Sequence, residues 1–113
     1  MKIKTSELTG AALDWAVAKC EGITEGMDKA WYYDRRDAYK FSTDWAQGWP
    51  IIEREKISLW ARKNEWAAES FIQNQQGSEQ AGNTPLIAAM RCYVASKLGD
   101  EVTIPDELME QTP

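Results

Sequence analysis

The residues that could carry out chemistry are concentrated in the middle of the chain, between Phe41 and Trp60. This stretch, FSTDWAQGWPIIEREKISLW, contains three of the six tryptophans, and Glu53 and Glu55 stand on either side of Arg54. Paired carboxylates can hold separated pKa values and so divide acid and base roles between them. In a short helix, however, these two side chains would point to different sides, and on a strand no burying pocket is indicated. We therefore interpret the pair as part of a solvated, charged turn.

A nucleophile is a second kind of chemistry to consider, because hydroxyls and thiols are present. Ser42 and Thr43 precede Asp44, but the sequence contains no histidine, so the usual general base is missing. Cys20 and Cys92 lack the same base, and each lies within an apolar helical pattern, a setting that raises a thiol pKa. We expect no enzyme activity, and we predict that Ser42 to Asp44 form a turn or cap a helix.

No cofactor and no metal is predicted. Two thiolates without a histidine would leave half of a tetrahedral zinc shell unfilled. The glycines are isolated and form no phosphate-binding loop of either common spacing. A disulfide between Cys20 and Cys92 is geometrically open if their helices are neighbours, but a reducing compartment favours buried free thiols.

The tryptophans are better suited to binding than to catalysis. A core of this size rarely encloses six indole rings, so some of them must lie near the surface, where tryptophans often anchor interfaces. The alternative is that the rings simply cover the small core. The candidate surface would bind another protein or a second copy of the chain, and its residues are Ser42, Thr43, Asp44, Trp45, Gln47, Trp49 and Glu53.

Single-stranded nucleic acid is the alternative ligand, because aromatic rings beside arginines can stack on bases. The residues of this alternative are Trp31, Tyr33, Arg35 and Arg36. Acidic residues stand among them, and the whole chain carries a net charge of −5. Since binding to a phosphate backbone depends on concentrated positive charge, nucleic acid is the disfavoured partner.

Two amphipathic helices are predicted on either side of the central stretch. The first follows Thr9 and stops at Gly22, and its apolar residues recur at i, i+3, i+4 and i+7 as Leu13, Ala16, Val17 and Cys20. The second begins with the cap Thr84 and with Pro85, whose ring is preorganised for the first helical position, and it ends at Gly99.

Alternating polarity or β-propensity predicts several short strands, at Met1 to Thr5, Trp31 to Tyr33, Ile57 to Trp60, Trp66 to Phe71 and Val102 to Ile104. The third and fourth would form a hairpin, although the fourth could equally be a short helix. Gly48 to Pro50 are predicted to break the chain before one or two helical turns over Pro50 to Glu55. The sequence therefore predicts an α+β fold, with two main helices packed on a small, mostly antiparallel sheet.

The chain of 113 residues is expected to form a single domain, residues 1–113. Residues 23–29 and the Gln- and Asn-rich residues 73–83 are expected to be loops, the latter mobile, and the tail after residue 108 is expected to fray. The start of the chain has no apolar core of signal-peptide length, and no run approaches the roughly 20 apolar residues of a membrane span. We expect a cytoplasmic protein without a membrane partner.

Three blocks of the sequence resemble one known family. They are KTSELTGAALDWAVAKCEG at 4–22, STDWAQGWPIIEREKISL at 42–59 and NTPLIAAMRCYVASKLGDEV at 83–102. In this order they resemble the NinX-like family of small proteins encoded by lambda-type bacteriophages and prophages. Trp49 stands where the family pattern has a small residue, and the approach to Ser42 is shorter than in that pattern.

The resemblance implies a phage or prophage origin and a location in the cytoplasm of the bacterial host. It implies no activity, because the family has no known function. The expected partner is then a phage or host protein, and the protein would be a non-catalytic accessory factor. Under the nucleic-acid alternative, it would act on single strands during phage replication or recombination.

Overall fold

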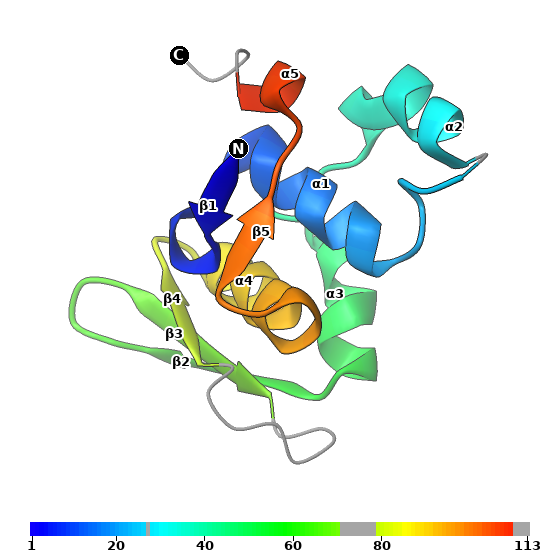
Figure 1. Cartoon of the computed structure of the whole chain (residues 1–113). Coiled ribbons are helices and arrows are strands. Elements are labelled where there is room, and N and C mark those ends of the chain that lie inside the picture. The colour runs from blue at the N-terminus through cyan, green and yellow to red at the C-terminus, as the bar shows by residue number, and fades with distance from the viewer. Residues whose placement is uncertain (27, 71–78, 110–113) are drawn as a thin grey trace.

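The computed structural model describes residues 1–26, 28–70 and 79–109 of the chain. Helix α4 (Pro85–Leu98) runs through the middle of the fold, with a three-stranded sheet on one side of it and α1 (Gly10–Cys20) on the other (Figure 1). The α+β class is thereby confirmed. The arrangement differs in one respect, because the main contacts of the three-stranded sheet are with α4, while α1 packs on α4.

Helix α4 follows the predicted signals. The Thr84 side chain accepts a hydrogen bond from the backbone N–H of Ile87 at 3.1 Å, Pro85 occupies the first turn, and Gly99 ends the helix with φ of 88°. Its buried residues lie on several sides of the helix: Leu86, Ala88, Ala89, Met90, Cys92, Tyr93 and Val94. A helix that is apolar almost all round is a core element, and α4 is the one around which the others pack.

The predicted hairpin is present. Strands β2 (Ile57–Ala61), β3 (Trp66–Ser70) and β4 (Gln80–Gly82) form an antiparallel sheet in the order β2-β3-β4. Of the two conformations considered for the second strand of the hairpin, the extended one is adopted. Strand β4 lies within the range that was predicted to be a loop, and this prediction was wrong for residues 80–82. The small residues Ala81 and Gly82 let this segment pair with β3 and pack closely on α4. Residues 73–78 lie outside the described part of the chain.

The predicted terminal strands pair with each other. Strand β1 (Lys2–Lys4) is antiparallel to β5 (Glu101–Thr103), with Ile3 opposite Val102. After β5 the chain forms the short helix α5 (Asp106–Met109), and residues 110–113 lie outside the described part.

The strand predicted at Trp31 to Tyr33 was wrong, because these residues lie in helix α2 (Asp28–Arg35). The helix also takes the last two residues of the loop predicted at 23–29. Successive helical residues point about 100° apart, so Tyr32 alone is buried, and it stacks on Tyr39 with 5.3 Å between ring centroids. The packing of the Tyr32 ring favours the helix, and it outweighs the β-propensity of the three aromatic residues, which favours a strand.

The break predicted at Gly48 to Pro50 was also wrong. Helix α3 (Trp45–Arg54) is continuous, with Pro50 inside it, and Asp44 caps its start by accepting a hydrogen bond from Ala46 N–H at 3.0 Å. Pro50 has no backbone N–H to donate to the carbonyl of Ala46, four residues earlier. Both residues lie on the exposed side of the helix. Gly48 serves close packing, because a Cβ there would lie 2.5 Å from Leu86 Cδ1 and 2.8 Å from the Phe41 carbonyl oxygen.

Candidate protein-binding surface

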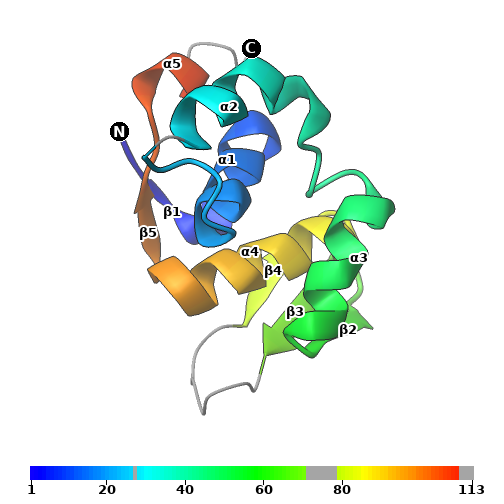
Figure 2. The same cartoon turned by 90° about the vertical axis from the view of Figure 1, so that its right-hand side faces the viewer.

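Helix α3 is apolar on two opposite sides. Its inner side buries Gly48, Ile51 and Ile52 against the core. Its outer side exposes Trp45, Ala46, Trp49 and Pro50, a spacing of i, i+1, i+4 and i+5 that places these residues on one face. A surface helix normally carries polar residues on its outer face, so this outer face is unusual. Figure 2 shows α3 at the periphery of the molecule, beside the first turns of α4.

The two outer tryptophans are paired. Trp45 is 45% exposed and Trp49 is 50% exposed, and their ring centroids lie 6.4 Å apart with the planes tilted by 47°. Beside Trp45 is an open groove of about 200 Å³ between the start of α3 and the start of α4, lined by Ser42, Thr43, Trp45, Thr84, Leu86 and Ile87. Trp45 both lines this groove and contacts Trp49, so the ring pair and the groove adjoin each other.

The structure divides the predicted surface residues into two groups. Thr43, Asp44, Trp45, Trp49 and Glu53 are exposed and belong to the outer surface. Two others support it from beneath, and their prediction as surface residues needs correction. Ser42 is buried, and Gln47 is half-buried with its polar groups hydrogen-bonded to Ala38, Lys40 and Asp44.

Gln47 fastens the segment that precedes α3. Its Nε2 donates to the Ala38 carbonyl at 2.8 Å and to Asp44 Oδ2 at 3.2 Å, while its Oε1 accepts from the Lys40 N–H at 2.9 Å. The Ser42 N–H donates to Asp14 Oδ1 in α1 at 2.9 Å. These hydrogen bonds hold the start of α3 in place, and the two tryptophans project from this part of the helix.

Asp14 is a supporting residue that the sequence analysis did not single out. Burial raises the pKa of this carboxyl group, while hydrogen bonds from Ser42 and the charge of Lys40 act in the opposite direction. The one signal available was an acidic residue within a turn of the apolar stripe of α1. The adjoining cavity has a volume of about 30 Å³, enough for a water molecule and too small for a larger ligand.

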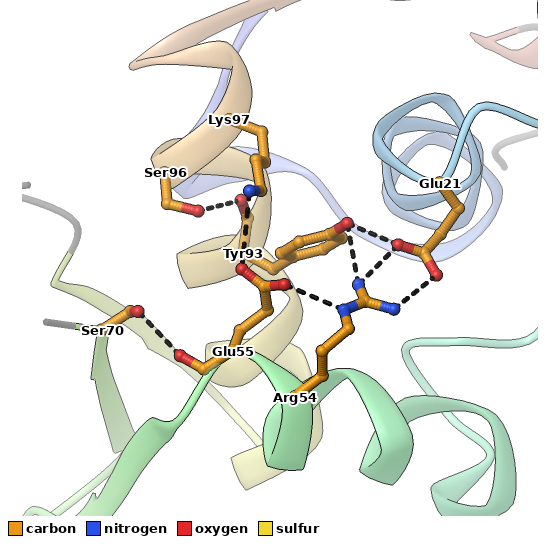
Figure 3. A network of polar contacts seen from close by, with 7 residues as sticks. All are labelled: Glu21, Arg54, Glu55, Ser70, Tyr93, Ser96 and Lys97. Carbon is orange, nitrogen blue, oxygen red and sulfur yellow. Dashed lines mark hydrogen bonds and ion pairs between the residues drawn. The ribbon is translucent and has the colours of Figure 1, made fainter. Parts of the chain in front are cut away.

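The pair Glu53 and Glu55 does not form a joint acid and base site. Glu53 is exposed, whereas the side chain of Glu55 is only 13% exposed and accepts from Arg54 Nε at 2.9 Å. The interpretation of both as a solvated turn is therefore wrong for Glu55. It belongs to a network at the far end of α3 (Figure 3).

This network joins α1, α3 and α4. Arg54 Nη2 lies 2.7 Å from Glu21 Oε2, the Tyr93 hydroxyl donates to the same carboxylate, and Lys97 lies 3.5 Å from Glu55 (Figure 3). Burial disfavours the ionised form of Glu21, but the hydrogen bonds from Arg54 and Tyr93 outweigh it, so the pKa of Glu21 is lowered. The network holds the C-terminal end of α3, as Asp44 and Gln47 hold its start.

The side chains of the nucleic-acid alternative are engaged with their neighbours in the structure. Trp31 is 46% exposed, but Arg35 already lies over its ring at 5.0 Å from the centroid, and Tyr39 contacts it edge-on. Tyr33 is half-buried and packs edge-on against Tyr32. Helix α2 therefore separates the aromatic rings that a strand would have aligned.

Other features bear on ligands. Cys20 is a free thiol, as predicted, and burial is the main cause that raises its pKa to about 12. Within residues 1–26, 28–70 and 79–109, no three Cys, Asp or Glu side chains come together as metal ligands. In the same part of the chain, each helix is too short or too polar to cross a membrane.

Comparison with known proteins finds one family. Residues 4–97 match the family described as Bacteriophage P22, NinX. The match runs from β1 to the last turn of α4 and includes the whole of α3. It confirms the family that the three sequence blocks predicted. No curated protein matches the chain.

Proposed function

The chain belongs to the family Bacteriophage P22, NinX, and from this premise we propose that it is a non-catalytic protein-binding module acting in the cytoplasm of the bacterial host. The family makes it a phage-encoded accessory protein. The binding surface is the outer face of α3 with the adjoining groove, and its principal residues are Thr43, Asp44, Trp45, Trp49 and Glu53. The partner is a phage or host protein.

The observation that carries this proposal is the exposure of two tryptophans that contact each other on a helix whose start is held by hydrogen bonds. Trp45 and Trp49 are each about half exposed, although burying an indole is strongly favourable. The bonds of Asp44 and Gln47 fix the helix from which they project. A rigid aromatic anchor loses little conformational entropy when it binds, so it can contribute much of the affinity of a small interface.

Replacing Trp45 or Trp49 with alanine is expected to weaken partner binding by roughly 30-fold, the effect of losing about 2 kcal/mol at an interface hot spot. The protein would be used to capture its partner from infected bacteria, and the affinity of the captured partner would then be measured with the purified variants. Trp31→Ala is the matched control, because Trp31 is equally exposed but lies on α2. Unchanged affinity in the Trp45 and Trp49 variants, with cooperative unfolding preserved, would exclude this surface.

Single-stranded nucleic acid is the less favoured ligand. Arg35 is engaged with Trp31, and the net charge of −5 opposes a phosphate backbone. A gel-shift series with single-stranded DNA at low salt separates the two candidates. A shift that is lost in Trp31→Ala and kept in Trp45→Ala would reverse the preference.

A further inference from the structure

The chain already supplies cations to several of its own aromatic rings. Three tryptophans lie beneath basic side chains, with Lys19 over Trp15 at 5.4 Å, Arg35 over Trp31 at 5.0 Å and Arg62 over Trp60 at 5.8 Å. The electron-rich face of an indole attracts a cation at such distances. One buried ring, Trp15, and two rings nearer the surface, Trp31 and Trp60, are thus paired with positive charge within the chain.

Among the described residues, the paired tryptophans of α3 have no such partner. Trp66 packs against the hydrophobic core, and within the described part of the chain no Lys or Arg side chain lies over Trp45 or Trp49. The nearest basic residue on the same helix, Arg54, is held by Glu21 and Glu55. Two indole faces therefore remain available to a cation from outside the chain.

Negative charge flanks the same rings. Asp44 directly precedes Trp45, and Glu53 lies four residues after Trp49, one helical turn further along the face. Both carboxylates are exposed, and in the described residues neither forms an ion pair. The carboxylate of Asp44 accepts hydrogen bonds from the Ala46 N–H and from Gln47 Nε2. These two carboxylates are thus placed to attract a cation beside the rings.

The size of the surface limits what can cover it. A tryptophan side chain offers about 150 to 250 Å², so two half-exposed rings present roughly 200 Å². A stable interface between folded domains buries about 800 Å² per partner. The exposed ring pair fits a short segment of chain better than the face of a second folded copy.

We propose that the surface of Trp45 and Trp49 binds a Lys or Arg side chain presented by a basic segment of the partner protein. The cation lies against the indole faces, and Asp44 and Glu53 interact with the charge from either end of the ring pair. This inference rests on the proposed protein-binding function and names the chemistry of its partner.

Short Ser/Gly peptides that carry several Lys or several Arg are the probes, compared with the same peptides carrying Gln or Glu. Binding is followed by the NMR shifts of the tryptophan indole N–H groups. The basic peptides are expected to shift the indole N–H signals of Trp45 and Trp49. They should bind at least about tenfold more tightly than the Gln peptides, and this difference in affinity should become smaller at high salt. Equal binding of the Gln peptides would overturn the inference.

Matched variants distinguish three contributions to peptide binding: the aromatic face of the tryptophans, their apolar area, and the negative charge beside them. Trp45→Leu and Trp49→Leu keep an apolar side chain without a π face, and each is expected to lose the preference for Lys and Arg about tenfold. The double variant Asp44→Asn with Glu53→Gln should lose most of the salt dependence. Trp31→Leu should keep both. Retention of the preference in Trp45→Leu and Trp49→Leu would assign the cation to another site and overturn the inference.

The captured partner distinguishes this inference from the function on which it rests. If capture depends on Trp45 and Trp49 but salt and basic peptides do not weaken it, the protein-binding function stands and the cation inference fails. If capture is indifferent to both tryptophans, the function fails as well. Dimerisation that Trp45→Leu abolishes, or DNA binding at these rings, would overturn the inference by giving the surface another occupant.

Discussion

Replacement of Gly82 with valine is expected to lower the free energy of unfolding by about 3 kcal/mol, the upper part of the range for overpacked sites. Strand β4 crosses α4 so closely that a Cβ at Gly82 would lie 2.7 Å from the backbone nitrogen of Ala88 and 3.1 Å from the carbonyl carbon of Ile87. These are main-chain atoms of the central helix, which cannot retreat without moving the elements packed around it. The loss is measured by chemical denaturation.

The neighbouring substitution Ala81→Val is the control. It adds a branched side chain to the same strand, at a half-buried residue that points to the other face of the sheet. Its expected effect is within about 0.5 kcal/mol. A similar small effect for Gly82→Val would show that β4 does not pack on α4 at the distance described.

Replacement of Arg54 with methionine is expected to cost about 2 kcal/mol near pH 7, between the values typical of exposed and buried ion pairs. The Arg54 side chain is half exposed, but the carboxylates it pairs are not, since Glu21 is 21% and Glu55 13% exposed. Methionine keeps much of the apolar stem and removes only the charge and the hydrogen bonds. Two partly buried carboxylates then lose a shared cation.

The effect of this substitution should depend on pH. The folded-state pKa of Glu21 lies below its ordinary value of 4.5, because the bonds from Arg54 and Tyr93 outweigh the penalty of burial. A lowered pKa contributes stability that is present above about pH 4.5 and is lost as the pH falls through the folded-state pKa. The difference between wild type and Arg54→Met should therefore be largest above pH 5 and shrink in acid.

Urea unfolding at several pH values measures this difference. Arg62→Met provides the comparison, since Arg62 also pairs with two carboxylates, Glu65 and Glu79, but all three side chains are more than 40% exposed. It should cost less than about 1 kcal/mol. A difference for Arg54→Met that stays constant from pH 7 to pH 3 would contradict the role assigned to Glu21.

Local signals in the sequence were sufficient for the elements that carry them. Thr84, Pro85 and Gly99 mark both ends of α4, and the polar break between Ala61 and Trp66 marks the hairpin. These residues act within a few positions of themselves, so neighbouring sequence is enough to interpret them.

The errors arose where distant contacts decide the conformation. Helix α3 continues through Pro50 because its inner residues pack on α4 and Pro50 faces outward. Counting indoles against core size predicted that some tryptophans are exposed, but their pairing on one face depends on that continuous helix. The contact of Glu21 with Tyr93 joins residues 72 positions apart, and no local pattern indicates it.

The sheet of β1 and β5 closes the longest loop in the described chain, since Lys2 lies opposite Thr103. Closing a loop of this length has the largest entropic cost of any strand pairing in the fold, and each strand contributes only three residues to offset it. Folding would therefore begin in the hairpin and α4, with this sheet assembled late. In native-state hydrogen exchange, the amides of β1 and β5 would be released ahead of those in α4.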